Sequence, residues 1–256
     1  MNRKKLKDAI QSRVATFGGW TSIGHPQLTE LIVRSSVDFV GIDLEHSTIS
    51  QEQAQRIIAA CHAHGTSCIP RVAGHNSESI RRLLDSGADG MLVPTVETPQ
   101  QVEKLVEWVK YPPVGRRGYG VASAQGYGHD FERYTKTWNE TSVLLIQVES
   151  IAAVENIDGL LQFDDVDGVM IGPYDLSGSL GVPGQIDSEL VQSASQRVVE
   201  SCKRHHKACG THIVDPSNES IQSALDIGYT FMALASDVFI LQKWGQETKR
   251  LLSQFR

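Results

Sequence analysis

The chain alternates short apolar runs with longer segments in which apolar positions recur at helical spacing. Eight apolar runs can be marked out, and in chain order they read VATFGGW, VDFVGID, SCIPRV, GMLVP, SVLLIQVE, DGVMIG, ACGTHIV and YTFMALA. Each run is short, contains β-branched or aromatic residues, and is followed by polar residues, which is typical of a buried strand. The pattern predicts eight strands separated by helices.

Capping residues locate the starts of two of these helices. Thr98, Pro99 and Gln101 have the spacing of a capping box with proline at the first helical position, and they precede an apolar face with spacing i, i+3, i+4, i+7 at Val102, Leu105, Val106 and Val109. Residues 50–53 form a second capping box, which predicts a helix beginning near Gln51. The polar residues 45–47 should therefore lie in the loop before that helix.

The number of units indicates the fold class. Eight strand–helix units in 256 residues give about 32 residues per unit, the size expected of a (β/α)8 barrel, with a doubly wound open sheet as the alternative. Segments 78–87 and 219–228 both read Glu-Ser-Ile and then Leu-Asp-x-Gly. They lie four units apart, which suits a ring of eight and also suits chance resemblance. No linker divides the chain, so residues 1–256 are predicted to form a single domain.

Composition narrows the possible partners. A net charge of -6 argues against a nucleic-acid binder and favours small or acidic ligands held by a cation. No apolar run approaches the ~20 residues that span a bilayer, and the basic N-terminus is not followed by the apolar core of a signal peptide. We expect a protein of the cytoplasm with no membrane partner.

The four cysteines form two pairs of equal spacing, Cys61 with Cys68 and Cys202 with Cys209. Both pairs carry neighbouring histidines, which raises the possibility of a zinc site. The predicted layout places the two pairs on different sides of the molecule. We therefore expect reduced structural thiols rather than one shared metal site.

Polar residues gather where the predicted strands end. In a barrel, the loops after the C-terminal ends of the strands form the active site. Each residue also has a simpler explanation, such as a helix cap for an Asp after Gly-Pro, but a carboxylate after the buried run VLLIQV needs a cation or hydrogen-bond donors. The residues at these strand ends are Asp43, Glu45, His46, Arg71, Gln147, Glu149, Gly172, Pro173 and Asp175.

Six motifs in this order resemble one family over nearly the whole chain. They are IDLEHSTIS at 42–50, PRV at 70–72, LLDSGADGMLVPTVETPQQ at 83–101, YPPVGRRGYG at 111–120, IQVES at 146–150 and IGPYDLSGSLGVPGQ at 171–185. The family is that of the class II, metal-dependent pyruvate aldolases, which include 4-hydroxy-2-oxoheptanedioate aldolase, 2-dehydro-3-deoxyglucarate aldolase and 2-keto-3-deoxy-L-rhamnonate aldolase. The resemblance implies a barrel of the phosphoenolpyruvate mutase/isocitrate lyase-like group. It also implies a homohexamer in which the last helix, about 236–254, is exchanged between subunits.

The resemblance also implies a metal and substrate site. Glu149 and Asp175 match the metal ligands, and an oxygen-only set with open positions suits Mg2+, Mn2+ or Co2+. Arg71 matches the arginine that donates to the keto oxygen as it becomes an enolate. The backbone around residues 172–175 (Gly172, Pro173, Tyr174 and Asp175) resembles a cradle for the substrate carboxylate, and Gln147 would line the same pocket.

His46 matches the family's histidine, and two roles are open for it. It would take the hydroxyl proton of the substrate directly or orient a metal-bound water that does so. Asp43, from the same strand, and Asp85, from a neighbouring subunit, are candidates to hold its second nitrogen. Glu45 would order waters around the ion. No lysine occupies these strand ends, which disfavours a Schiff-base aldolase.

Two departures from the family's pattern affect the aldehyde end of the site. Leu44 stands between Asp43 and Glu45, and residues 71–75 replace the usual proline- and tryptophan-containing loop. The glycine-rich segment after residue 115 contains aromatic and histidine side chains that would contact the aldehyde or, as we favour, shape a surface loop: Tyr119, Tyr127 and His129.

The leading hypothesis is an aldolase that cleaves a 4-hydroxy-2-oxo acid to pyruvate and an aldehyde, or catalyses the reverse condensation, through a pyruvate enolate stabilised by a divalent metal ion. One alternative is a related carbon–carbon lyase acting on a thioester or a malate-like acid. Another is a non-catalytic barrel that binds a ligand or assembles with partners. Intact Glu149, Asp175, Arg71 and His46 favour catalysis.

Overall fold

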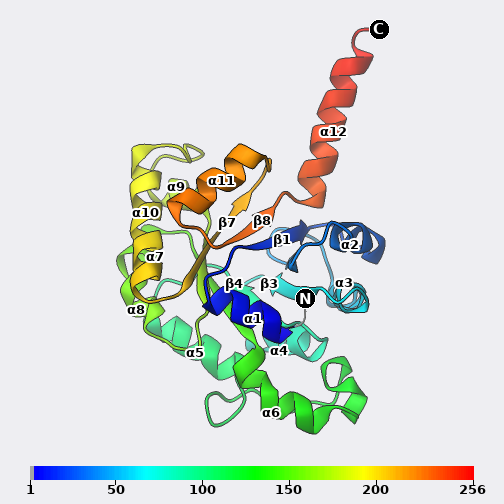
Figure 1. Cartoon of the computed structure of the whole chain (residues 1–256), viewed down its shortest axis with the longest axis vertical. Helices are drawn as coiled ribbons and strands as arrows, with labels where there is room; N and C mark the ends of the chain where they lie inside the picture. Colours follow the sequence, from blue (N-terminus) through cyan, green and yellow to red (C-terminus); the bar gives the residue numbers. More distant parts are fainter. Residues whose placement is uncertain (1–2) are drawn as a thin grey trace.

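The eight strands close into a parallel barrel in a computed structural model that describes residues 3–256 (Figure 1). Neighbouring strands follow sequence order, and β8 pairs with β1, so the open-sheet alternative is excluded. All eight predicted strands are present: β1 Thr16–Thr21, β2 Phe39–Asp43, β3 Ser67–Arg71, β4 Gly90–Val93, β5 Val143–Val148, β6 Gly168–Ile171, β7 Ala208–Ile213 and β8 Phe231–Leu234.

Helices surround the barrel and connect its strands (Figure 1). Three connections carry more than one helix. Two α-helices and a 3-10 helix follow β4, two short helices follow β5, and a short helix and a long one follow β6. The helical elements are α1 Arg3–Gln11, α2 Pro26–Val33, α3 Gln51–Ala63, α4 Ser77–Asp85, α5 Pro99–Val109, η1 Ser123–Gly128, α6 Phe131–Thr141, α7 Ile151–Glu155, α8 Ile157–Leu161, α9 Pro173–Ser179, α10 Glu189–Arg204, α11 Asn218–Ile227 and α12 Asp237–Leu252.

Both capping boxes predicted from the sequence are formed. Ser50 accepts a hydrogen bond from the Gln53 backbone, and α3 begins at Gln51. Thr98 does the same for Gln101, and α5 begins at Pro99 with its apolar face buried. The two repeated segments form α4 and α11, which follow β3 and β7, so they occupy equivalent positions four units apart.

Large side chains fill the barrel interior. Phe39 and Phe231 belong to an inner cluster that also contains Trp20, Leu145 and Met170. Each ring is accommodated by a glycine in the neighbouring strand. A Cβ at Gly18 would lie 2.3 Å from the Phe39 ring, and a Cβ at Gly210 would lie 2.2 Å from the Phe231 ring. The interior is therefore packed, and a ligand can enter only at its ends.

Helix α1 covers the N-terminal end of the barrel. Leu6 and Ile10 are buried in the inner cluster. Between them, the Lys7 ammonium lies 2.6 Å from the Asp167 carboxylate and donates to the Ser142 carbonyl at 2.9 Å. This end of the barrel is sealed by an apolar plug with a buried ion pair at its centre.

Helix α12 projects away from the barrel instead of packing along it (Figure 1). A mainly apolar cavity of about 680 Å³ lies beside its first turns, between α2 and β8, and includes Leu28, Leu31 and Ile32 among its lining residues. Several large apolar side chains of the helix are exposed, namely Val238, Ile240, Leu241, Trp244, Leu251 and Leu252.

All four cysteines are free and buried. Cys61 of α3 lies next to Cys68 of β3, and Cys202 of α10 lies next to Cys209 of β7, in keeping with their expected role as reduced structural thiols. Burial raises the pKa of the Cys68 and Cys209 thiols, which disfavours the reactive thiolate. Within residues 3–256, none of the helices combines the length and the apolar character that crossing a bilayer requires.

Candidate active site

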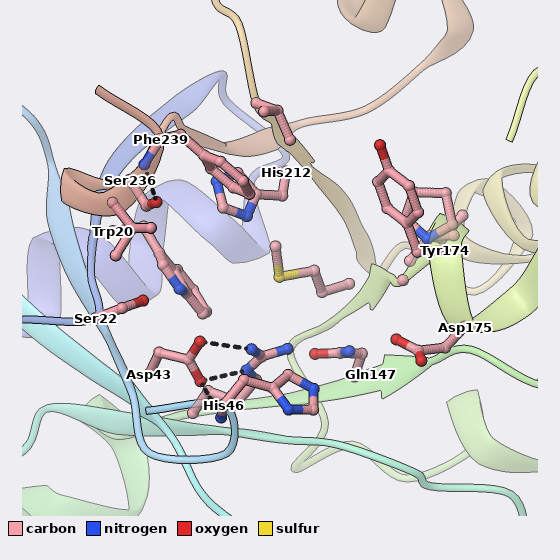
Figure 2. A pocket seen from close by; sticks show the side chains of 17 residues that line it. Trp20, Ser22, Asp43, His46, Gln147, Tyr174, Asp175, His212, Ser236 and Phe239 are labelled. Carbon is pink, nitrogen blue, oxygen red and sulfur yellow. Dashed lines mark hydrogen bonds and ion pairs between the residues drawn. The ribbon is translucent and has the colours of Figure 1, made fainter. Parts of the chain in front are cut away.

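A cavity of about 370 Å³ opens at the C-terminal end of the barrel (Figure 2). Most of the strand-end residues identified in the sequence line this cavity. They come from different strands, and the parallel barrel brings the ends of these strands together. The predicted residues that line it are Asp43, His46, Arg71, Gln147, Gly172, Pro173, Tyr174 and Asp175. Glu149 lies directly behind Gln147 and Gly172.

Arg71, at the end of β3, is held in one orientation. Its Nε and Nη2 donate to the two oxygens of Asp43 at 3.2 and 2.9 Å, and its Nη1 lies 3.2 Å from Glu45 Oε2. The guanidinium carbon lies 5.3 Å from the centroid of the Trp20 ring. A planar guanidinium fixed in this way keeps N–H groups of Nη1 and Nη2 for a ligand in the cavity.

Asp43 binds Arg71 and the backbone of the loop that follows β2. Besides binding Arg71, its Oδ1 accepts hydrogen bonds from the backbone N–H groups of Glu45 and His46, both at 3.1 Å. It makes no hydrogen bond to the imidazole of His46 among the described contacts, because its oxygens already face the guanidinium and the loop. In this structure Asp43 orients Arg71, and its role at the second ring nitrogen of His46 stays a prediction.

His46 lies at the rim of the cavity with 64% of its side chain exposed, and its Nε2 is 3.7 Å from Glu45 Oε2. Asp85 does not line this cavity. It lies at the end of α4, where its Oδ1 accepts a 2.7 Å hydrogen bond from the buried Arg117. A contribution of Asp85 to a neighbouring subunit's site stays a prediction.

Glu149 is a buried carboxylate immediately after β5. Its Oε1 accepts a 2.6 Å hydrogen bond from the Thr95 backbone N–H, and its Oε2 contacts the Gln147 side-chain amide. Thr95 adopts a left-handed backbone conformation, φ 53°, which is uncommon for a β-branched residue. Burial raises the pKa of Glu149 and nearby Asp175 raises it further, while the hydrogen bonds from Thr95 and Gln147 oppose the shift. Strained backbone is therefore used to hold this carboxylate in place.

The donor set fits a hard divalent cation. Glu149 and Asp175 supply two carboxylates close enough for the charge of one to raise the pKa of the other. Glu45 Oε2 is buried and lacks a hydrogen-bond partner among the described residues, since Nη1 of Arg71 lies outside hydrogen-bonding geometry. No group of three or more His, Cys, Asp or Glu side chains with metal-binding geometry occurs within residues 3–256. A cation held by these two carboxylates would keep most of its coordination positions for water or substrate, which suits Mg2+ or Mn2+.

The first turn of α9 supplies backbone donors beside these carboxylates. Gly172 precedes the helix, but its N–H donates to the Val148 carbonyl at 3.1 Å, and Pro173 has no N–H. The available donors of the predicted cradle are therefore Tyr174 and Asp175, whose N–H groups have no partner within the helix at these positions. Figure 2 shows both residues on the same side of the cavity.

The sequence of this chain matches one known protein family over most of its length. Residues 16–243 match the model of the HpcH/HpaI aldolase/citrate lyase family. The chain belongs to this family. Its members are aldolases and lyases that act on carbon–carbon bonds, so this HpcH/HpaI-family protein is a carbon–carbon lyase, and the closed barrel is the family's fold.

Named relatives cover nearly the whole chain. The hydroxypyruvate/pyruvate aldolase of Roseobacter denitrificans is 35% identical over 94% of this chain and 94% of its own. The 2-keto-3-deoxy-L-rhamnonate aldolase of Salmonella typhi is 34% identical over 92% of this chain and 88% of its own. The crystal structure of an HpcH/HpaI aldolase/citrate lyase family protein from Burkholderia cenocepacia is 25% identical, with a TM-score of 0.91 and coverage of 98% and 99%.

Sequence reasoning missed several residues that line the cavity of this HpcH/HpaI-family protein. Trp20 is in β1, His212 is in β7, and Phe239 is in the first turn of α12. Reading the C-terminal ends of the first and seventh strands, which both lie in runs identified from the sequence, would have found Trp20 and His212. Phe239 gave no such signal, because nothing in the sequence shows that α12 starts over the barrel mouth.

No lysine is among the described residues that line the cavity. Burial lowers the pKa of Lys110 to about 8, but its Nζ donates to the Asn139 carbonyl and the Ser142 hydroxyl just before β5, at the opposite end of the barrel. A lysine there cannot form a Schiff base with a substrate at the C-terminal end.

The aromatic residues of the glycine-rich segment also lie outside the cavity of their own chain. Tyr119 stacks on the buried Tyr111 at a centroid distance of 4.7 Å. Tyr127 adopts a left-handed conformation, φ 52°, and is exposed, and His129 follows η1. Within the chain these residues shape a surface loop.

Proposed function

We propose that the protein is a divalent-metal-dependent aldolase that cleaves a 4-hydroxy-2-oxo acid to pyruvate and an aldehyde, or catalyses the reverse condensation. The observation that supports it most directly is that the Asp175 carboxylate and the fixed Arg71 guanidinium line one cavity, with the Glu149 carboxylate directly behind its wall at Gln147 and Gly172. Family membership supplies the reaction class, and this site supports the choice of a 2-oxo acid.

Glu149 and Asp175 would hold the metal ion, for which Mg2+, Mn2+ and Co2+ are the candidates. When bound, the ion supplies Lewis-acid stabilisation of negative charge that develops on the substrate oxygens. Glu45, whose buried Oε2 lacks a hydrogen-bond donor among the described residues, would accept a hydrogen bond from a water in this region. Burial raises the pKa of Glu45 as well, and the Arg71 charge opposes that rise.

Protein groups would orient both ends of the pyruvate unit. The backbone N–H groups of Tyr174 and Asp175 face the substrate carboxylate, and the positive end of the helix dipole adds to their attraction. The free N–H groups of Arg71 would donate to the C2 oxygen. In the cleavage direction the C3–C4 bond breaks, its electron pair passes to the C2 oxygen as the enolate forms, and Arg71 stabilises that oxygen because its donors are already oriented.

His46 would accept the proton of the C4 hydroxyl in the cleavage direction. Its exposed imidazole at the cavity rim can accept that proton directly or through one water, and the aldehyde leaves as the C4–O bond becomes a carbonyl. The enolate then takes a proton at C3 to give pyruvate. Asp43 contributes by holding Arg71 and the loop that carries His46.

Assembly and location are further parts of the proposal. The exposed apolar face of α12 and the apolar cavity beside it support exchange of this helix between subunits, and a hexamer is the assembly that family resemblance favours. The net charge of -6 and the small cavity favour small-molecule partners over nucleic acid, and we place the protein in the cytoplasm.

The test is pyruvate release from a panel of 4-hydroxy-2-oxo acids by chelator-treated protein, with and without Mg2+, Mn2+ or Co2+. We expect activity only with added ion, and a loss of at least about a hundredfold in Glu149→Ala and Asp175→Ala. Glu189→Ala, which removes an exposed carboxylate, is the matched control and should keep full activity. A folded, ion-supplemented protein that releases no pyruvate from any member would argue for a non-catalytic barrel.

A further inference from the structure

His212 occupies a part of the cavity that the pyruvate half of the reaction does not use. It lies near the end of β7, with its ring 5.5 Å from the Trp20 ring and 6.0 Å from the Phe239 ring. Figure 2 shows His212 and Phe239 on the side of the cavity away from Asp43 and Gln147, with the Trp20 ring between His212 and Asp43. The aldehyde portion of a substrate whose 2-oxo acid lies against Arg71 would extend toward such a wall.

The hydrogen bonding of His212 determines its tautomer. Nε2 lies 2.9 Å from the backbone carbonyl of Ala235, and a carbonyl only accepts, so Nε2 carries the proton. Nδ1 of the neutral ring is therefore an acceptor, and it has no hydrogen-bond partner among the described residues. Burial lowers the pKa of His212 and the charge of Arg71 lowers it further, which keeps the ring neutral near pH 7.

The side chains around His212 are neutral. Ser22, Val214 and Ser236 line the cavity beside Trp20 and Phe239, and the cationic guanidinium of Arg71 is held by Asp43 at the other side. Arg71 is the one arginine or lysine among the described lining residues, and its guanidinium lies 5.3 Å from the Trp20 ring. Its charge is already paired with both oxygens of Asp43, so an anionic group in this region would find no unpaired cation. A hydroxyl group would find an acceptor at Nδ1 and further hydroxyls at the serines.

We propose that His212 is a specificity-determining residue whose Nδ1 accepts a hydrogen bond from a hydroxyl group of the aldehyde, so that the site selects neutral, hydroxylated aldehydes. This inference rests on the proposed aldolase function and names the class of its second substrate. A site built to bond a hydroxyl discriminates against the analogue that lacks it, because the analogue covers the acceptor without giving it a hydrogen-bond donor.

The experiment compares condensation of pyruvate with glycolaldehyde and with acetaldehyde, which differ by one hydroxyl group, using the ion-loaded protein. The readout is the ratio of the two kcat/KM values. We expect His212→Leu to lower this ratio by roughly tenfold relative to the wild type. His212→Gln can both donate to Ala235 and accept in the cavity, and it should restore most of the ratio. His64→Leu removes an imidazole that bonds the Ala60 carbonyl on a distant helix, and it should keep the wild-type ratio.

Intrinsic reactivity differs between the two aldehydes, but it cancels when ratios are compared between variants. An equal ratio in wild type and His212→Leu would overturn the role of His212, and so would a wild-type preference for the anionic succinic semialdehyde over glycolaldehyde. Exchange of the pyruvate methyl protons with D2O, followed by NMR without any aldehyde, tests the enolate step separately in the wild type. No exchange would overturn the proposed function and this inference together, whereas exchange with an unchanged ratio overturns only the inference.

Discussion

A glycine contributes to the geometry of the candidate metal site. A Cβ at Gly172 would lie 2.9 Å from Glu149 Oε2 and 3.0 Å from Gln147 Nε2, closer than side-chain atoms normally approach. The backbone of this residue has an ordinary φ of -98°, so the glycine is needed for space and not for conformation. Close approach of the backbone to the carboxylate is what lets the first turn of α9 stand beside Glu149.

We therefore expect Gly172→Ala to reduce the rate of pyruvate proton exchange at least about tenfold, because Glu149 and Gln147 must move by a substantial part of an ångström. Added Mg2+ or Mn2+ should also raise the melting temperature less in this variant than in the wild type. Gly178→Ala, in the same helix, is the control, since a Cβ at this position would have no atom within 4 Å. Equal exchange rates in the two variants would contradict this account.

Several site residues could be predicted from sequence because their positions follow from strand ends alone. Arg71 ends β3 and Asp175 lies in the first turn of the helix after β6, and a parallel barrel brings all such strand ends together. The partner of Asp43 could not be predicted in this way, because a carboxylate in that loop can bond a guanidinium, an imidazole or the backbone, and only three-dimensional distance decides which. The acceptor at His212 was hidden for the same reason, since its tautomer depends on the carbonyl of Ala235, the residue after β8.

Among the elements, α1 shows how a polar residue can anchor a hydrophobic plug. Lys7 and Asp167 are both almost fully buried, and their ion pair is supplemented by a hydrogen bond from Lys7 to the Ser142 carbonyl. Asp167 also accepts from the Leu144 backbone N–H, which ties β5 to the residue before β6. The helix is thereby fixed in rotation as well as in position.

Replacement of the buried Lys7 should destabilise the fold. We expect Lys7→Ala to lower the free energy of unfolding by about 3–5 kcal/mol in urea denaturation, because Asp167 is left charged and unpaired in the interior. Lys4→Ala removes an exposed ion pair with Asp8 from the same helix and should cost less than about 1 kcal/mol. Equal free energies of unfolding in the two variants would show that the buried ion pair stabilises the fold no more than the exposed one.

Helix starts were predictable where a local signal sets them, as at Gln51 and Pro99. The location of α1 was not, because an amphipathic pattern indicates that one face is buried but not which surface covers it. Division of the segment after β6 into the short α9 and the long α10 was missed for a similar reason. The turn between them is specified by glycines at 181 and 184 with positive φ, whose effect on the path of the chain depends on packing.

For the molecule as a whole, α12 is the element that a single barrel does not explain. Its exposed apolar side chains include Trp244, and the cavity of about 680 Å³ beside its first turns is also apolar. Monomeric proteins rarely expose apolar surface of this kind in one contiguous element. Exchange of the helix between subunits would bury both surfaces.

We expect Trp244→Glu to shift the assembly to a smaller species in light scattering coupled to size exclusion, because a charge would be placed in the exchanged interface. Glu247→Ala, on the same helix, should leave the molar mass unchanged. A wild type that is monomeric at micromolar concentration, or a Trp244→Glu variant with the wild-type mass, would refute exchange through this face.

The first turn of α12 also contacts the end of β1 and the wall of the cavity. Asp237 accepts hydrogen bonds from the Thr21 hydroxyl and from the backbone N–H groups of Ser22 and Ile23, and Phe239 packs on His212 inside the cavity. One rigid helix thus joins the wall of the reaction chamber to the surface through which subunits would meet. By thermodynamic reciprocity, a substrate that orders this wall favours assembly to the same extent that assembly favours the substrate. Dilution would then act on this protein as an antagonist does, and its own abundance would set part of its affinity.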